Sequence, residues 1–459
     1  MALTILSYVM IIAFMYVIMT KKLSPLTALV MIPLAFAIIT LISGVASPPV
    51  DSTTGQVGSM NIGDWVTSGL KTTSNTGIML LFAILYFSIM LDAGMFDPIT
   101  NKMIGLAKGD PMRVLMATAI VAACVSFNGD GTTTTLICCT AFLPIYKKLD
   151  MKVMNLGVLV ILQNTIMNLL PWGGPTARAM AVFGVGSEIL AYLLPGMIIS
   201  VLFVIFVVAR HMGKQERERL GIAQMSNEEI HSLTVADDPE TAAIKRPNLF
   251  IFNLTLTLIL IIWLVAGSFI DSISLPSSML FIVGTCIALL VNYPSLKDQA
   301  DRIEADGGAA VQVVVLIFAA GIFMGLFQGS GMADALAQSL VNIIPKQLAG
   351  FWGIIIALIS APGTFFLSND GFYFGVMPAL AQAGYAYGFT SMQMALASLM
   401  GQAFHLLSPL VAFIYLLLRL TGLDMGEWQR ASAKWALCIF GIFVVTIIAT
   451  GQVPIYIAQ

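Results

Sequence analysis

The chain has 459 residues, of which 58% are hydrophobic and only 10% are charged. Soluble globular domains carry about 25% charged residues, so this composition excludes a soluble protein and indicates a surface that faces hydrocarbon. The net charge of −2 provides no basic surface for a polyanion, which excludes nucleic acid as a partner.

Spanning helices account for most of the sequence. A helix needs about 20 apolar residues to cross the hydrocarbon core, and about ten stretches approach that length. The predicted spans are 4–20, 24–46, 76–98, 152–184, 187–210, 248–271, 277–293, 308–329, 391–420 and 431–455. We therefore predict an all-α, multi-pass protein of the cell membrane.

Two further apolar stretches, 113–146 and 349–385, are interrupted by polar segments that contain glycine. The first interruption is Asn-Gly-Asp-Gly at 128–131, which four threonines follow, and the second is Ser-Asn-Asp-Gly at 368–371. Each half is too short to cross the membrane alone at an ordinary tilt. We therefore predict two re-entrant hairpins, hairpin one and hairpin two, whose tips meet near the membrane midplane.

Basic residues determine the predicted orientation. With the N-terminus outside and each hairpin returning to its side of entry, all but three of the 22 Lys and Arg residues fall on the cytoplasmic side. Lys71 and Lys346 fall outside, and Arg178 falls within the membrane. This distribution follows the positive-inside rule, so hairpin one is predicted to enter from the cytoplasm and hairpin two from outside.

The two halves of the chain repeat each other. The segment around Gly94 recurs around Gly331, and Asp130 is separated from Asp370 by nearly the same interval. The predicted parts are an N-terminal repeat (1–210), a cytoplasmic linker (211–247) and a C-terminal repeat (248–459). Five spans precede the second repeat, an odd number, so the repeats are inverted. Inverted repeats with broken helices are typical of secondary transporters.

Four ionisable side chains lie in the predicted membrane interior, namely Asp130, Asp370, Arg178 and His405. A charge at the centre of a spanning helix costs about 2.5–3.5 kcal/mol, so these residues are expected to face a cavity or one another. Asp130 and Asp370 occupy matching places in the two tips, which suits a divalent cation of the magnesium or calcium type. Helix capping is the alternative, because Asp accepts hydrogen bonds from the free N–H groups of a helix start.

The predicted span 152–184 is about 50 Å long as a straight helix, and its Asn-Leu-Leu-Pro-Trp-Gly-Gly-Pro segment at 168–175 predicts a break. Arg178 follows this break, where a guanidinium can bind a carboxylate through two hydrogen bonds or extend to the outer interface. His405 takes the place of Asn168 in the second repeat, before a Ser-Pro break. It is expected either to bond a backbone carbonyl or to carry a proton.

Four motifs in this order resemble the citrate–divalent-metal:proton symporter family of the ion transporter superfamily. They occupy 128–131, 168–178, 368–375 and 405–411, and the resemblance covers essentially the whole chain. It implies uptake of citrate or a related carboxylate as a complex with a divalent cation, driven by protons. It also implies a homodimer with an elevator motion of the hairpin-bearing domain. Many members carry Asp at the position of Asn128, which leaves the metal preference open.

The candidate site combines the two tips and the two breaks. The expected solute contacts are Asn128, Gly131, Thr132, Gly173, Gly174, Thr176, Arg178, Ser368, Asn369, Gly371, His405 and Ser408, with Asp130 and Asp370 on the metal. A sodium-coupled di- or tricarboxylate carrier of the same superfamily is the nearest alternative, and a passive channel is another. An intramembrane protease would need the two aspartates side by side on facing helices, which inverted glycine-flanked tips fit poorly. We therefore expect a transporter and not an enzyme.

Overall fold

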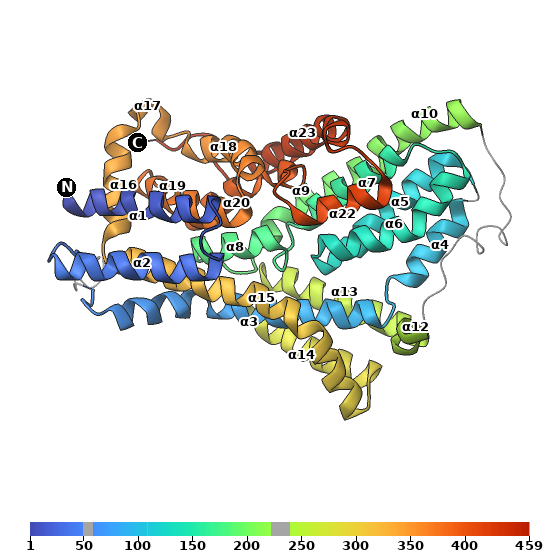
Figure 1. The fold of residues 1–459 in the computed structure, drawn as a ribbon, viewed down its shortest axis with the longest axis horizontal. Coiled ribbons are helices and arrows are strands. Elements are labelled where there is room, and N and C mark those ends of the chain that lie inside the picture. Colours follow the sequence, from blue (N-terminus) through green and yellow to red (C-terminus); the bar gives the residue numbers. More distant parts are fainter. Residues whose placement is uncertain (49–57, 108, 222–238, 459) are drawn as a thin grey trace.

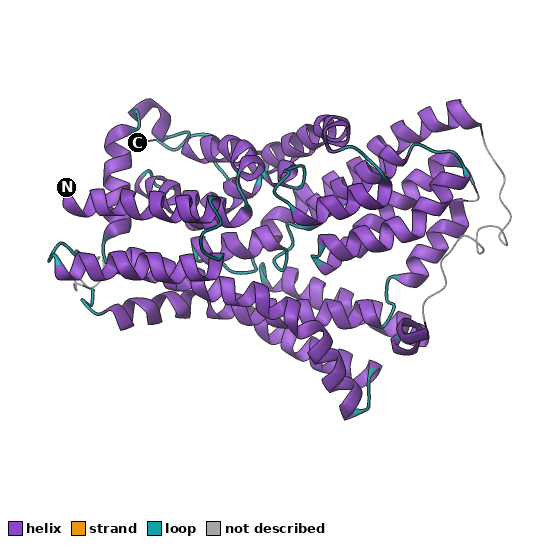
Figure 2. Cartoon of the chain, viewed as in Figure 1, coloured by secondary structure: helices purple, strands orange, loops and turns teal. Residues whose placement is uncertain are grey.

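The computed structural model describes residues 1–48, 58–107, 109–221 and 239–458 (Figure 1). The elements of the first half are α1 (Ala2–Met19), α2 (Pro25–Ile42), α3 (Ile62–Asp92), α4 (Asp97–Ala107), α5 (Pro111–Val125), η1 (Ser126–Asn128), α6 (Gly131–Lys148), α7 (Val153–Met167), α8 (Gly174–Phe183), α9 (Ile189–Phe203), η2 (Val204–Ala209) and α10 (Arg210–Leu220). Those of the second half are α12 (Pro239–Ile244), η3 (Pro247–Leu249), α13 (Phe250–Gly267), η4 (Asp271–Ile273), α14 (Ser277–Asn292), α15 (Leu296–Gly329), α16 (Met332–Ile343), α17 (Lys346–Ala349), α18 (Trp352–Phe366), η5 (Gly371–Val376), α19 (Met377–Ala386), α20 (Ser391–Leu399), α21 (Gln402–His405), α22 (Ala412–Thr421) and α23 (Met425–Ala449). Every regular element of the described residues is a helix (Figure 2), so the all-α prediction is confirmed.

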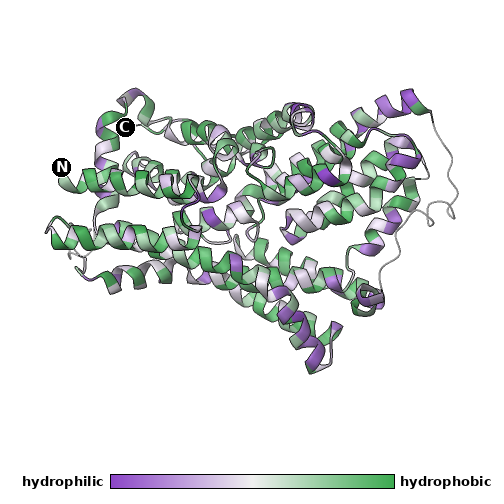
Figure 3. Ribbon diagram, in the orientation of Figure 1, coloured by the Kyte–Doolittle hydropathy of each residue, from purple (hydrophilic) through white to green (hydrophobic). Residues whose placement is uncertain are grey.

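Eight helices of the described residues are long and apolar enough to cross a bilayer. They are Ala2–Met19, Pro25–Ile42, Ile62–Asp92, Pro111–Asn128, Ile189–Leu220, Pro247–Gly267, Leu296–Gly329 and Met425–Ala449. Large apolar side chains such as Ile12, Ile262 and Val445 are exposed on them, as expected where lipid is the solvent. Polar residues gather at α10 and at the start of α15 (Figure 3).

Three of the predicted spans are not single long helices. The spans 152–184 and 391–420 are each divided by a break, and 277–293 is a helix of 16 residues. Conversely, Pro111–Asn128 reaches spanning length, although we expected each half of hairpin one to be too short. The reason is that η1 adds a further turn to α5 and carries the helix to the tip.

The long helices α3 and α15 begin earlier than predicted. The predicted starts were 76 and 308, whereas the helices begin at Ile62 and Leu296. In α3 the additional turns are stabilised by Asn61, whose side chain accepts a hydrogen bond from the N–H of Gly63 at 2.7 Å. A run of apolar residues marks only the part of a helix that lies inside hydrocarbon. Polar turns beyond that part are therefore missed when spans are assigned by hydropathy.

Close glycine contacts join α3 to α15. A Cβ at Gly69 would lie 2.0 Å from the carbonyl oxygen of Gly321, and one at Gly325 would lie 2.2 Å from that of Trp65. Small residues let two membrane helices approach backbone to backbone, which strengthens their packing. The helices α2, α3 and α15 therefore pack side by side (Figure 1).

The two hairpins lie at opposite ends of the molecule (Figure 1). The helices α5 and α6 lie at the end that contains α10, whereas α18 and α19 lie at the end with both chain termini. The loops of both hairpins are in the middle of the molecule (Figure 2). The helix–turn–helix form is thus present in both, and the return of each hairpin to its side of entry stays a prediction.

The helix after each hairpin is broken as expected. Residues 168–173 separate α7 from α8, and residues 406–411 separate α21 from α22. The predicted linker begins inside a helix, because α9 continues through the π-helical turn η2 and α10 to Leu220. Part of that linker, 222–238, lies outside the described residues.

Candidate functional site

The first broken helix turns sharply at Gly173. A Cβ there would lie 2.1 Å from the carbonyl oxygen of Asn168, so a side chain would clash with the backbone of the turn. The buried hydroxyl of Thr176 donates a hydrogen bond to the Leu169 carbonyl at 2.9 Å. Thr176, a predicted solute contact, therefore fastens α8 to the break.

The tip of hairpin one rests on this break. Trp172 donates from Nε1 to the carbonyl of Phe127 at 2.8 Å. Asn128 folds the tip locally, since its Oδ1 accepts from the N–H of Asp130 at 2.7 Å. The tip also reaches the second broken helix, because a Cβ at Gly131 would lie 2.3 Å from the ring of Phe413.

Asp130 is exposed and caps α6. Its Oδ2 accepts from the N–H of Thr133 at 2.7 Å, and its Oδ1 accepts from that of Thr132 at 3.3 Å. Capping, the alternative role for this residue, is therefore present in the structure. It does not exhaust the carboxylate, which has about four lone-pair positions.

Asp370, at the tip of hairpin two, forms an ion pair with Arg178 on α8. Its Oδ1 accepts from Nε of Arg178 at 2.6 Å, and both side chains are less than one fifth exposed. The same guanidinium donates from Nη1 to the carbonyl of Gly174 at 2.8 Å. Arg178 therefore points to the tip of hairpin two and does not extend to an interface.

The remaining residues of the second tip bond to the backbone and to α21. Ser368 Oγ accepts from the N–H of Gly371 at 3.1 Å. Asn369 Oδ1 accepts from Nε2 of Gln402 at 3.0 Å, and that nitrogen lies 3.2 Å from the hydroxyl of Tyr373. Gln402 escaped our sequence reasoning, although an amide in the apolar stretch before His405 was a visible signal.

His405 is buried beside hairpin two. Its Nδ1 is 2.8 Å from the carbonyl oxygen of Thr364 on α18, which can only accept, so Nδ1 carries the proton. The hydroxyl of Thr364 in turn donates to the carbonyl of Gly401 at 2.8 Å. Ser408 is buried, and its Oγ accepts from the N–H of Leu410 at 3.2 Å. The two bonds of Thr364 fasten the second broken helix to α18, whereas the bond of Ser408 is local to the break.

The predicted site residues are thus only partly joined. The structure connects Arg178 to Asp370 and Asn369 to α21, whereas Asp130 and Asp370 share no hydrogen bond within the described residues. In the same part of the chain, no group of three or more His, Cys, Asp or Glu residues could hold a metal ion. The carboxylate of Asp130 therefore bonds within its own tip, whereas that of Asp370 pairs with Arg178 on α8.

A cavity of about 550 Å³ lies beside hairpin one, between α6, α4 and the end of α3. Thr133 and Thr140 line it from α6. Asp92 and Asp97 line the opposite side, and each forms an ion pair at 2.7 Å, with Arg302 and Lys245 respectively. The cavity gives the polar face of α6 an open space next to the tip.

The comparisons with known proteins agree with one another. The model of the citrate transporter family matches residues 14–401. The chain is 44% identical over 435 residues to a citrate transporter of Bacillus subtilis (strain 168), covering 95% of each protein. It is 40% identical over 451 residues to the Mg(2+)/citrate complex secondary transporter of the same strain, covering 97% of this chain and 98% of the relative.

A solved structure shares the fold. The crystal structure of the YdaH transporter of Alcanivorax borkumensis superposes with a TM-score of 0.58 at 15% identity, covering 94% of this chain and 100% of that one. That likeness concerns architecture alone, whereas the sequence matches identify the family. The chain therefore belongs to the citrate transporter family, and it is a multi-pass membrane transporter and not an enzyme.

Proposed function

We propose that the chain takes up citrate as a complex with a divalent metal ion, in symport with protons. Its family is that of citrate transporters, and one relative is named an Mg(2+)/citrate complex secondary transporter. The observation that carries the proposal is the ion pair of Arg178 and Asp370, formed between α8 and the tip of hairpin two.

The two charges of this ion pair complement the two parts of a metal–citrate complex, the cation and the carboxylates. Free citrate carries about three negative charges near neutral pH, and transferring them from water to a membrane interior is very unfavourable. A divalent ion offsets two of them. The cation suits Asp370 and a remaining carboxylate suits Arg178, whereas bare citrate would be attracted by Arg178 and repelled by Asp370.

Asp130 is the second proposed ligand of the cation. Magnesium is usually held by one or two carboxylates together with oxygens of the substrate and water, so Asp130 and Asp370 need no third protein carboxylate. The helix start at Gly174 offers backbone N–H groups to the anionic part of the complex, whereas Asp130 already accepts from the N–H groups of Thr132 and Thr133 at the start of α6. Gly173 directly precedes the start of α8, and Thr132 lies in the first turn of α6 that Asp130 caps, which supports their assignment to the solute.

His405 is the proposed proton carrier. Its Nδ1 is fixed by Thr364, which leaves Nε2 as the nitrogen that can gain a proton. An elevator motion of the hairpin-bearing helices within a homodimer completes the proposal. The glycine-packed contact between Gly69 on α3 and Gly321 on α15 supports these two helices as part of the static body.

Uptake of labelled citrate into proteoliposomes tests the proposal, with each divalent ion added in turn and a proton gradient imposed. We expect uptake against the citrate gradient that collapses when a chelator removes divalent ions and rises with an inward proton gradient. Full-rate, sodium-driven uptake in excess chelator would contradict the proposal and favour the sodium-coupled carrier. Equilibration without accumulation would indicate a passive channel.

A further inference from the structure

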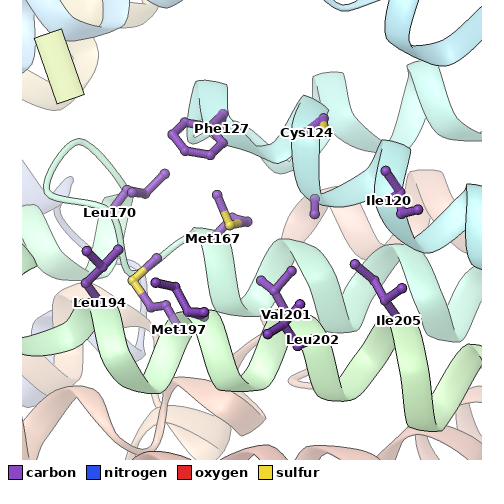
Figure 4. A pocket seen from close by; sticks show the side chains of 12 residues that line it. Ile120, Cys124, Phe127, Met167, Leu170, Leu194, Met197, Val201, Leu202 and Ile205 are labelled. Carbon is purple, nitrogen blue, oxygen red and sulfur yellow. The ribbon is translucent and has the colours of Figure 1, made fainter. Parts of the chain in front are cut away.

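An apolar groove runs along the outer face of hairpin one. Its inner part is a cavity of about 330 Å³ between α5, the tip and α9 (Figure 4). Phe127, Cys124 and Ile120 line it from the hairpin, and Met197 and Val201 line it from α9. Every residue that lines this cavity is apolar or a cysteine, so it suits a hydrocarbon chain and not the transported anion.

The groove continues toward the start of α5. A second cavity of about 280 Å³ lies between α4 and α5 and shares Ile120 with the first. Met116 and Arg113 line this outer part. Arg113, Met116, Ile120, Cys124 and Phe127 follow one another at intervals of three or four residues, so they form one stripe on a single face of the helix.

The length of the stripe matches a lipid tail. Arg113 and Phe127 are 14 residues apart, which is about 21 Å along a helix. One leaflet of the hydrocarbon core is about 15 Å thick, half of the whole core. A fatty acyl chain that begins at Arg113 and follows a tilted α5 can therefore reach the tip of hairpin one.

The start of the groove carries a positive charge. The side chain of Arg113 is 61% exposed, and its contact to Asp110 is long, at 3.5 Å. Asp110 instead pairs closely with Arg217, which donates to both of its oxygens. Arg113, Arg217 and Asp110 together carry a net charge of about +1. The Arg113 guanidinium therefore keeps N–H donors that can bind a phosphate.

We propose that this groove binds an anionic phospholipid of the predicted cytoplasmic leaflet. Its phosphate lies at Arg113, and one acyl chain fills the groove from Met116 to Phe127. Lys102 lies on the same face of α4 as Leu106, which lines the outer cavity, and its ammonium group adds to the attraction. The lipid then packs directly behind the tip of hairpin one.

Lipid retention by the purified full-length protein tests the proposal, measured by native mass spectrometry after exchange into detergent. The probes are phosphatidylglycerol and phosphatidylcholine with identical acyl chains, a short-chain phosphatidylglycerol, and inorganic phosphate. We expect retention of the long-chain phosphatidylglycerol alone. Arg113→Gln should lower it about fivefold, the factor that corresponds to about 1 kcal/mol for a basic side chain at an anionic surface.

Two matched pairs of variants test binding of the phosphate headgroup and binding of the acyl chain separately. Arg430→Gln removes an exposed arginine from the start of α23 and should leave retention unchanged. Ile198→Trp places a bulky ring at the groove from an exposed position and should lower retention, whereas Leu437→Trp, on the exposed face of α23, should not. Equal retention of both long-chain lipids, or equal losses within either pair, would overturn the proposal. Dimerisation that buries the groove and excludes lipid would also overturn it.

Discussion

The tips of the two hairpins have nearly the same sequence pattern and use it differently. Asp130 is exposed and caps α6, whereas Asp370 makes no cap and pairs with Arg178. In the second tip the cap comes from Ser368, which bonds the N–H of Gly371. An Asp-Gly pattern therefore predicts where a tip lies, but it does not predict which group binds the carboxylate.

The helices that precede the two hairpins also differ in the helix on which they pack. The helix α4 packs against α5, the first helix of hairpin one, whereas α16 packs against α19, the second helix of hairpin two. A cavity of about 550 Å³ lies between α4 and α6 beside hairpin one, and one of about 510 Å³ lies between α16 and α19 beside hairpin two. The helix before each hairpin thus packs on a different helix of that hairpin, and this difference suits the proposed elevator motion.

The largest expected effect follows removal of the charge from the second tip. Asp370→Asn leaves Arg178 without its anionic partner, so we expect a loss of about 2–4 kcal/mol in the free energy of unfolding. Metal–citrate uptake should fall by about 100-fold, as expected for a lost hydrogen bond to a charged group. Proteoliposome uptake and unfolding of the purified protein measure the two effects.

A double variant separates stability from transport at this pair. Arg178→Gln together with Asp370→Asn removes both charges, so most of the stability should return while uptake stays lost. Recovery of uptake along with stability would show that the pair is only structural, which contradicts its proposed role in binding the complex.

At the first tip, Asp130→Asn should leave the fold intact and still impair transport. Asn caps helices about as well as Asp, so we expect the free energy of unfolding to change by less than about 0.5 kcal/mol. Metal-dependent uptake should fall about tenfold or more, because a charged ligand of the cation is lost.

The matched control for this variant is Asp424→Asn. Asp424 caps α23 by accepting from the N–H of Glu427 at 3.0 Å, and it lies outside both tips. Its variant should transport at the wild-type rate. Wild-type uptake by Asp130→Asn as well would make capping the whole role of Asp130.

Local sequence signals predicted the breaks and the tips but not their pairing. Gly173 and the neighbouring prolines predict the first break, because proline lacks the backbone N–H that would continue a helix. The partner of Arg178 lies 192 positions away, and no periodicity reports a contact at that range. The π-helical turn η5 (Gly371–Val376), which precedes α19, likewise depends on tertiary packing. The positions of the tips were therefore predictable and their different bonding was not.

His405 links the second broken helix to hairpin two, and two substitutions test its role at a smaller expected effect. His405→Asn can keep a donor in the place of Nδ1 toward Thr364, whereas His405→Gln places its amide nearer to Nε2. A proton carrier predicts that both variants flatten the pH dependence of uptake, because neither amide titrates. A normal pH profile in the Asn variant, with loss of function confined to Gln, would assign His405 to the bond with Thr364 alone.

The smallest expected effect concerns the cap of the second tip. Ser368→Ala removes the acceptor for the N–H of Gly371 and should lower the free energy of unfolding by about 1 kcal/mol. Since Ser368 is also a predicted solute contact, we expect KM for the metal–citrate complex to rise about 2–10-fold with kcat unchanged, the range of one neutral hydrogen bond. Thr390→Ala is the matched control, because Thr390 caps α20 by accepting from the N–H of Gln393. It should cause a similar loss of stability without a change in KM. If the two variants behave alike, Ser368 acts only as a cap, and the difference between the tips then lies in Asp370 and Arg178.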